Sequence, residues 1–387
     1  MYIDLLKKHI KNGILHLHLP NGGEYTFGQQ GVEAHWNIKD EDAIRSIAKD
    51  WEFELGETYI RGQWDAGSTG LRNLLAVLRE NFTSYRLNRW LLPFGEALKE
   101  WNKIKRSYSN VSHHYDVPAP VFRKFLDDEM YYSCAYFPQE SLTLEQAQQA
   151  KAHHIASKLL IKPGNRILDI GCGWGSLAFH LAKHYDCEVV GITLSKEQLA
   201  VARREQEIRG ARNVRFELSD YREHKGSYNR IVSVGMFEHV GRPFYETYFG
   251  QVRDLLRQDG VALIHTIGRS GPPGLTNPWI RKHIFPGGST PALSEITRAI
   301  EHSRLQVNDI EVWRLHYANT LRSWYDRFQQ NRDAISGLMN EEFCRMWEFY
   351  LSACEAAFRY SDLVVYQVQL AKQHGSVPVS RDYLYRG

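Results

Sequence analysis

The sequence has 387 residues, of which 43% are apolar, 12% aromatic and 24% charged, as is typical of a folded globular protein. This composition excludes collagen-like, coiled-coil, disordered and disulfide-rich chains. Lys and Arg exceed Asp and Glu by 48 to 45, and this balance excludes a general nucleic-acid binder. At roughly 100–200 residues per domain, the length predicts two domains.

The cysteines and the hydropathy pattern favour a cytoplasmic protein. Five cysteines are an odd number and include no C-x-x-C pair, which fits a reducing compartment. No apolar run reaches 18 residues, and residues 1–22 lack the apolar stretch of a secretory signal. The 17 histidines fall in no Cys/His set with zinc-ligand spacing, so we expect no metal.

The N-terminal part is predicted to form a small α+β domain over residues 1–82. Residues 13–20 and 24–27 alternate apolar and polar around the turn Asn21-Gly22-Gly23, which predicts a β-hairpin. Residues 40–51 and 68–81 have helical periodicity. This domain shows no catalytic constellation.

Residues 83–106 are predicted to connect this domain to the next. The stretch at 101–106 (WNKIKR) combines basic residues with aromatic and apolar ones. One interpretation is a linker that packs on the following domain. The other is a segment that seeks the surface of anionic lipid.

From residue 161 onward, strands alternate with helices. Short apolar strands are predicted at residues 166–170, 187–192, 214–218, 230–234 and 261–264, with helices at 176–185, 196–208 and 244–256. Longer helices at about 318–330 and 340–360 precede a last strand candidate at 363–368. The alternation predicts an α/β domain over residues 107–387, with a parallel sheet covered by helices on both faces.

A glycine-rich turn follows the first of these strands, at residues 169–175 (DIGCGWG). Glycines there let the backbone approach a ligand beside a helix N-terminus. The spacing is G-x-G-x-G, whereas the dinucleotide fingerprint is G-x-G-x-x-G. Asp169 at the strand end suits a ligand with a cationic group and would repel a pyrophosphate.

Residues at the ends of the next two strands also suit a nucleoside ligand other than NAD. The second strand ends without the acid that holds the ribose in NAD enzymes, although Thr193 and Gln198 could supply polarity. Asp220 and Tyr221 follow the third strand and could bind and stack an adenine. Each of these residues alone is also typical of an ordinary loop. Together, at the carboxyl ends of successive strands, they predict S-adenosylmethionine as cofactor.

At this level of detail the chain resembles the cyclopropane-fatty-acid synthases and the related mycolic-acid cyclopropane synthases. The resemblance extends over residues 107–372 and is less close in the N-terminal domain. It rests on the segments HYD at 114–116, YSCAYF at 132–137, ILDIGCGWG at 167–175, GITLSKEQ at 191–198, GMFEHVG at 235–241, HTIG at 265–268, PWI at 278–280, IFPGG at 284–288 and HY at 316–317.

The resemblance implies a class I S-adenosylmethionine-dependent methyltransferase fold with a mixed seven-stranded sheet. It also implies an activity: a cis double bond of an unsaturated phospholipid acyl chain takes the methyl of S-adenosylmethionine, bound bicarbonate removes a proton from that methyl, and a cyclopropane ring closes. An N-terminal domain favours the branch of the family that acts on phospholipids.

The resemblance also implies site residues. The cofactor set is Tyr115, Tyr132, Ser133, Asp169, Gly171, Cys172, Gly173, Trp174, Gly175, Thr193, Leu194, Gln198, Asp220, Tyr221 and Arg222. The bicarbonate set is Cys134, Glu238, His265, the backbone of Ile267, and Tyr317. Apart from the resemblance, Glu238 itself could be the base, and His239 is interpreted as structural. Cys354 matches a cysteine suspected of a catalytic role, yet a cysteine among Ala and Phe on a helix is usually buried packing.

Aromatic rings could stabilise a carbocation as it forms, and the site must exclude the water that would trap it. The candidates are Tyr132, Tyr136, Phe137, Phe237 and Tyr317, with Tyr248, Phe249 and Trp324 as weaker ones. For Phe249 and Trp324 we favour simple core packing.

The expected partners are a phospholipid bilayer and a second copy of the chain, with binding at the inner face of the membrane. The N-terminal domain is expected to dock on lipid or to pair subunits. Two alternatives stay open within the methyltransferase class, namely addition of a branched methyl without ring closure and methylation of a small-molecule amine. A lipid-binding or scaffold protein with a decayed domain is disfavoured, because Asp169 and the glycines are intact.

Overall fold

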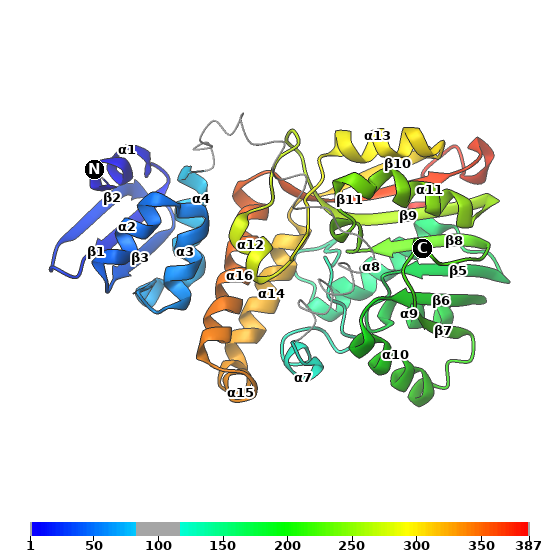
Figure 1. Ribbon diagram of the computed structural model, residues 1–387, viewed down its shortest axis with the longest axis horizontal. Coiled ribbons are helices and arrows are strands. Elements are labelled where there is room, and N and C mark those ends of the chain that lie inside the picture. The colour runs from blue at the N-terminus through cyan, green and yellow to red at the C-terminus, as the bar shows by residue number, and fades with distance from the viewer. Residues whose placement is uncertain (1, 83–116, 386–387) are drawn as a thin grey trace. The chain divides into compact units, whose positions relative to one another are not determined.

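The computed structural model describes residues 2–82 and 117–385, which form two compact units (Figure 1). The smaller unit holds residues 2–82, 276–284 and 317–363, and the larger unit holds residues 117–275, 285–316 and 364–385. The expected connector at 83–106 lies outside the described residues. The sequence predicts one boundary near residue 105, whereas two later stretches of the chain belong to the smaller unit.

A seven-stranded sheet with the order β10-β11-β9-β8-β5-β6-β7 forms the centre of the larger unit. Neighbours from β7 to β9 pair in parallel, and β10 pairs with β11 antiparallel, so the sheet is mixed as expected. The strands are β5 (Asn165–Ile170), β6 (Cys187–Thr193), β7 (Val214–Leu218), β8 (Tyr228–Val234), β9 (Leu256–Arg269), β10 (Gln306–Trp313) and β11 (Leu363–Ala371).

Helices cover both faces of this sheet, which confirms the predicted layers. Ile167 and Val189 belong to one apolar cluster with residues of α8, α9 and α10, while Leu168 and Val190 belong to another with residues of α11 and α13. Successive strand residues point to opposite faces, so both clusters draw on the same strands. The helices are α7 (Ala119–Phe122), α8 (Leu144–Leu159), α9 (Ser176–His184), α10 (Lys196–Arg209), α11 (Tyr245–Leu255) and α13 (Leu293–Ser303).

Local signals fix the ends of several of these helices. Thr143 and Gln146 form a reciprocal capping box at the start of α8. Ser195 caps α10 by accepting from the amide of Gln198, and Gly210 ends that helix in the left-handed conformation with φ 61°. Each cap satisfies backbone groups that a helix end leaves unpaired.

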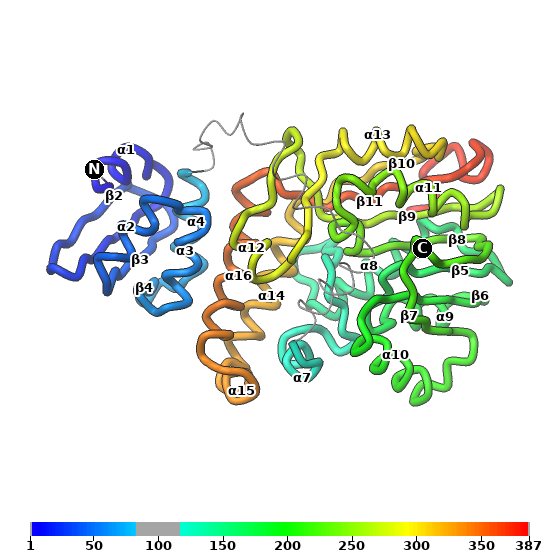
Figure 2. The backbone as a smooth tube through the Cα atoms, viewed as in Figure 1, coloured from blue at the N-terminus to red at the C-terminus, as the bar shows by residue number. Residues whose placement is uncertain are grey.

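The smaller unit contains a four-stranded sheet with the order β2-β1-β3-β4, and the tube in Figure 2 follows its path. The predicted hairpin is present, because β1 and β2 pair antiparallel. β3, which the sequence analysis did not place, lies parallel to β1 on its other side. The elements of this part are α1 (Tyr2–His9), β1 (Gly13–His18), β2 (Glu24–Gln30), β3 (Glu33–Ile38), α2 (Glu41–Lys49), α3 (Trp51–Ile60), β4 (Trp64–Asp65) and α4 (Gly70–Phe82).

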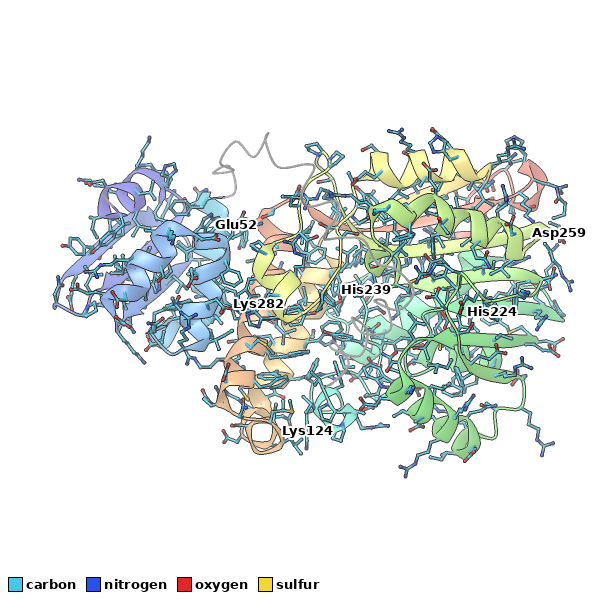
Figure 3. All side chains as sticks on the ribbon, in the orientation of Figure 1. Glu52, Lys124, His224, His239, Asp259 and Lys282 are labelled. Carbon is cyan, nitrogen blue, oxygen red and sulfur yellow. The ribbon has the colours of Figure 1, made fainter. Side chains whose placement is uncertain are left out.

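Four helices from later in the chain complete the smaller unit. They are α12 (Pro278–His283), α14 (His316–Gln330), α15 (Arg332–Leu338) and α16 (Glu341–Tyr360). Lys282 on α12, labelled in Figure 3, donates to Glu57 of α3 at 2.9 Å. Arg72 on α4 donates from Nε to Glu355 of α16 at 2.7 Å. Among the described residues, no helix combines the length and apolarity needed to cross a bilayer.

Gly56 tests the contact between α3 and α12. A Cβ at Gly56 would lie 2.7 Å from Cδ1 of Trp279, whose side chain is 1% exposed. We expect Gly56→Ala to lower the free energy of unfolding by about 1–3 kcal/mol, as overpacking does. Gly250 on α11 is the matched control, because a Cβ there meets nothing within 4 Å.

In a urea titration, Gly250→Ala should leave stability unchanged or raise it by about 1 kcal/mol, through the higher helix propensity of alanine. Equal effects of the two substitutions would contradict the tight contact at Gly56.

Candidate functional site

The glycine turn after β5 forms the floor of the candidate site. Gly171, Gly173 and Gly175 all have positive φ, at 83°, 58° and 89°. The amides of Gly171 and Cys172 donate to the carbonyl of Ile192 on β6, at 2.9 and 3.0 Å, which ties the turn to the neighbouring strand. The turn leads directly into α9, so backbone N–H groups gather there as the sequence predicts.

Close neighbours explain why two of these positions require glycine. A Cβ at Gly171 would lie 2.7 Å from Cγ of Met236, and one at Gly175 would lie 2.9 Å from Cε1 of Phe216. A Cβ at Gly173 would meet nothing within 4 Å, so the backbone borders open space there. Such a cradle suits close approach of a ligand to the turn.

Asp169 lies at the end of β5, only 2% exposed. Burial raises the pKa of its carboxyl to about 7, and the nearby Lys151 ammonium partly offsets that rise. A buried carboxylate with a raised pKa gains from a ligand that brings a positive charge. The α-ammonium group of S-adenosylmethionine has that charge.

Lys151 on α8 is a site residue that the sequence analysis missed. It is 1% exposed, its Nζ lies 3.8 Å from the ring centroid of Tyr131, and it donates to Oγ of Ser133 at 2.9 Å. Burial lowers its pKa, and the charges of Asp127 and Asp169 oppose that effect. A lysine on the apolar face of a helix rich in Ala was the signal that could have revealed it.

The loop before α8 carries several predicted residues. Gln148 donates from Nε2 to the carbonyl of Ser133 at 3.0 Å, and Lys151 donates to its hydroxyl. Two side chains of α8 therefore fix both the backbone and the side chain of Ser133. The Phe122 ring contacts two aromatic residues. Its centroid lies 5.1 Å from that of Tyr132 and 4.9 Å from that of Trp174 in the glycine turn. The loop and the turn are therefore connected through shared aromatic packing. Tyr115 lies outside the described residues.

The ends of β6 and β7 carry the other predicted cofactor residues. Thr193 donates to Oε1 of Gln198 at 3.0 Å, and Leu194 follows at the strand end. Both carboxylate oxygens of Asp220 accept from the guanidinium of Arg222, at 2.8 and 2.6 Å. The polar side chains at these two strand ends are thus hydrogen-bonded in pairs, Thr193 with Gln198 and Asp220 with Arg222.

The Tyr221 ring is the remaining adenine-side candidate. It is 7% exposed, packs edge-on against Tyr248 at 5.2 Å, and its hydroxyl has no hydrogen-bond partner among the described residues.

Glu238 lies in the short 3₁₀ turn Phe237–His239 that follows β8, and His265 lies within β9, opposite Val234 at the end of β8. Oε1 of Glu238 accepts from the amide of Ile267 at 2.6 Å, while its Oε2 is buried without a hydrogen-bond partner among the described residues. Burial raises the pKa of Glu238 to about 7. The Thr266 hydroxyl is near enough to offset a small part of the rise in the pKa of Glu238, but Oε2 receives no hydrogen bond of normal geometry from the described residues, so this oxygen is available to an incoming group.

His265 is held as a neutral imidazole. Burial, and after it the charge of Lys151, lower its pKa well below the ordinary value. Gln367 donates from Nε2 to Nδ1 at 3.1 Å, which leaves the ring proton on Nε2. The ring lies edge-on to Trp313 at 5.1 Å.

The other two side chains of the expected bicarbonate set, Cys134 and Tyr317, belong to different units of the chain. Cys134 is 1% exposed, and its thiol donates to the carbonyl of Ala135 at 3.3 Å. Tyr317 belongs to the smaller unit, where its ring packs against Phe358 at 4.9 Å and Trp324 at 5.9 Å.

Cys354 also belongs to the smaller unit, on α16. Burial raises the pKa of its thiol to about 12, which disfavours a nucleophilic thiolate.

The aromatic candidates separate into core and loop positions. Phe237, Tyr248 and Phe249 are fully buried in the cluster beside α11. Tyr136 is half-buried and stacks on His154 at 4.6 Å and on Trp313 at 4.8 Å. His239, labelled in Figure 3, lies edge-on to Phe285, and burial lowers its pKa to about 4.

Comparisons with known proteins agree on one family. The model of the family "Mycolic acid cyclopropane synthetase" matches residues 102–368. The cyclopropane-fatty-acyl-phospholipid synthase of Escherichia coli K12 is 38% identical over 337 residues, which cover 87% of each chain. The tuberculostearic acid methyltransferase of Mycobacterium tuberculosis is 36% identical over 354 residues, 86% of this chain and 82% of that protein.

Among solved structures, the mycolic acid cyclopropane synthase CmaA1 in complex with SAH and CTAB superposes with a TM-score of 0.64 at 34% identity. The match covers 68% of this chain and 97% of that one. It confirms the predicted methyltransferase fold and supports S-adenosylmethionine as the cofactor. Coclaurine N-methyltransferase, at 22% identity and a TM-score of 0.68, shares the fold.

Asp169 should make cofactor binding depend on pH. Its pKa of about 7 means that the carboxylate, which the ligand ammonium requires, is a minority below pH 7. Binding of S-adenosylhomocysteine should therefore strengthen about tenfold between pH 6 and pH 8, as measured by isothermal titration calorimetry.

Asp169→Asn should weaken binding and remove this pH dependence, whereas Glu238→Gln should retain it. A wild-type pH profile in Asp169→Asn would refute the assignment to Asp169.

Proposed function

The chain belongs to the mycolic acid cyclopropane synthetase family, and we propose that it is a cyclopropane-fatty-acyl-phospholipid synthase. Its substrate would be an unsaturated phospholipid with a cis double bond. The single observation that carries the proposal is Glu238, whose buried carboxyl has a pKa of about 7 and one unpaired oxygen at the ligand edge of the sheet. A proton must leave the site for a ring to close, and such a group suits that task.

The overall reaction fixes what the site must do. Alkene and S-adenosylmethionine give cyclopropane, S-adenosylhomocysteine and one proton. The cofactor, when bound, supplies an electrophilic methyl. The chain contributes the glycine turn and Asp169, which would orient the cofactor, and Ser133, which Lys151 holds in place. Correct orientation matters because an unactivated alkene is a poor nucleophile.

Bicarbonate fits part of the expected residue set. The free oxygen of Glu238 could accept from its hydroxyl, and Nε2–H of His265 could donate to one of its oxygens. The amide of Ile267 already donates to Glu238, so it would have to be shared. If bound there, bicarbonate would supply the base for the methyl proton, and Glu238 and His265 would fix its orientation.

Exclusion of water is the second requirement. Cys134, Ala135 and Phe137 of the loop at 131–137 are buried. Tyr132 and Tyr136 are half-buried aromatic candidates that retain some exposed surface on this loop. We propose that these rings line the acyl-chain slot and stabilise positive charge on it.

A phospholipid substrate requires contact with a bilayer. Residues 101–387 hold 36 Lys or Arg and 31 Asp or Glu, a net charge of +5 that is compatible with anionic headgroups. The proposal therefore includes reversible binding at the inner face of the membrane, together with a homodimer as the family resemblance implies. Vesicle flotation and light scattering test these two parts.

A branched-methyl product is the second candidate, favoured by the 36% identity to a protein named tuberculostearic acid methyltransferase. The same assay distinguishes the two. The protein is incubated with S-adenosylmethionine and vesicles of monounsaturated phospholipid, and the acyl chains are analysed by mass spectrometry. A gain of CH₂ with loss of the double bond supports ring formation, whereas the same gain of CH₂ with unsaturation retained supports the second candidate, because loss of a proton from the methylated cation then forms a new double bond and no hydride donor is supplied. Turnover of small amines with lipid inert would overturn both.

Glu238→Gln tests the role of the carboxyl. The amide oxygen can still accept from Ile267, so the fold should survive while proton acceptance is lost. We expect ring formation to fall by roughly 100-fold or more, in the range of lost acid–base catalysis. Glu246→Gln is the control, because Glu246 is exposed on α11 and pairs with His302. Wild-type rates in Glu238→Gln would overturn the assignment.

Cys354→Ala tests whether this thiol takes part in chemistry. A thiol with a pKa of about 12 is almost entirely protonated at neutral pH. We expect the variant to form rings within about threefold of the wild-type rate, with any loss traceable to a lower melting temperature from the missing side chain. A loss comparable to that of Glu238→Gln, in a protein that melts normally, would make Cys354 catalytic.

A further inference from the structure

We infer that the N-terminal sheet carries a binding site for a transition-metal ion of the zinc class, built from His16, Glu33 and His35. One nitrogen from each imidazole and one carboxylate oxygen all lie within 4.8 Å of one another. From the sequence we expected no metal, because Glu33 and His35 follow His16 by 17 and 19 positions, a spacing that matches no zinc-ligand pattern.

Strand pairing brings the ligands together. β1 and β3 are parallel, and His16 is the direct partner of His35 in their register. Their rings stack with centroids 4.8 Å apart. Glu33 precedes His35 by two residues, so both side chains point to the same face of the sheet. The opposite face is apolar, with Leu15, Leu17 and other residues in the core.

The distances are close to those of a coordination site. Oε1 of Glu33 lies 3.1 Å from Nε2 of His16 and 3.9 Å from Nε2 of His35. Zinc bonds of about 2.0–2.1 Å in a tetrahedron place ligand atoms roughly 3.4 Å apart, so small rotations of these side chains suffice. Imidazole ligands favour zinc, copper or nickel over magnesium and calcium.

Neighbouring groups orient both imidazoles. Glu24 lies 3.4 Å from Nδ1 of His18, and a carboxylate can only accept, so His18 carries its proton on Nδ1. Nε2 of His18 then accepts from Nδ1–H of His35 at 3.4 Å, and the lone pair of His35 Nε2 faces Glu33. This relay of hydrogen bonds resembles the outer partners that fix ligand tautomers in metal sites.

His16 has its own orienting partner. Its Nδ1 lies 3.0 Å from Oγ1 of Thr26 on β2, which can accept the Nδ1 proton. Without an ion, Nε2–H of His16 donates to Oε1 of Glu33 at 3.1 Å. A metal that displaces this proton would select the tautomer with its proton on Nδ1, facing Thr26, and Nε2 would then coordinate beside Glu33. The side chains of His16 and His35 are 27% and 28% exposed and that of Glu33 is 57% exposed, so an ion can enter from solvent. A water or another small ligand would complete the tetrahedron.

Titration of the full-length protein with ZnCl₂ tests this site by calorimetry. We expect one saturable site per chain that depends on these residues, with the affinity reduced by roughly 10-fold or more in Glu33→Gln and in a His16→Asn/His35→Asn double variant. Thr26→Val should weaken binding through the lost acceptor for Nδ1. Cobalt(II) should give the intense visible absorption of a four-coordinate ion in the wild type, and the double variant should lack it.

His302→Asn is the matched control, because His302 forms a single exposed pair with Glu246. It should bind zinc as the wild type does. Zinc should also raise the melting temperature of the wild type and not that of the double variant, since binding to the folded state stabilises it. Glu33 is exposed, so Glu33→Gln keeps the test valid if the double variant fails to fold. Absence of saturable binding, or equal zinc affinity in wild type and Glu33→Gln, would overturn the inference.

Discussion

The buried ammonium of Lys151 is the charge on which the arrangement of the ligand edge depends. It lies on α8, which packs against β8 and β9, and its Nζ donates to Oγ of Ser133 and lies over the ring of Tyr131. Its charge acts on the buried carboxyls of Asp127 and Asp169. Removing one member of such a buried charge set leaves its partners uncompensated, at a cost of about 3–5 kcal/mol. One residue of α8 therefore connects the loop at 131–134 to the end of β5.

Burial also places two carboxyl groups that titrate near neutral pH, Asp169 and Glu238, at the ligand edge of the sheet. The pKa values of Asp169 and Glu238 rise to about 7 because the sheet edge is dry, not because the two carboxyls share a proton. A cationic ligand beside Asp169 would favour its ionised form and displace a proton. Within the part of the chain that the structure describes, no cation lowers the pKa of Glu238, so its carboxyl can take a proton near neutral pH. Two acids of similar pKa can thus perform different tasks through their neighbours.

The parts of the fold that the sequence could predict depend on local patterns. Runs such as residues 166–170 are mainly apolar, with Ile167, Leu168 and Ile170, and the glycines that follow adopt positive φ, so strand, turn and helix were predictable from adjacent residues. Lys151 was missed because a lysine within a helical pattern is normally assigned to the solvent face. The parallel pairing of β1 with β3 was missed because a hairpin pattern says nothing about the third strand. Both depend on contacts between segments that sequence order does not reveal.

The assignment of 317–363 to the smaller unit follows from buried carboxylates. Glu348 on α16 accepts from the hydroxyl of Tyr59 at 3.0 Å, and Glu355, about two turns further along the same face, accepts from Arg72 at 2.7 Å. Both glutamates are buried, so each requires a donor when folded. Arg345, also on α16, donates back to the carbonyl of Tyr59 at 2.7 Å. A fragment without residues 2–82 would keep these charges on α16 and lose those partners. Arg332 would still pair with Glu348, and Arg359 with Glu355, so the helix that carries Cys354 would lose part of its stabilisation without the N-terminal domain.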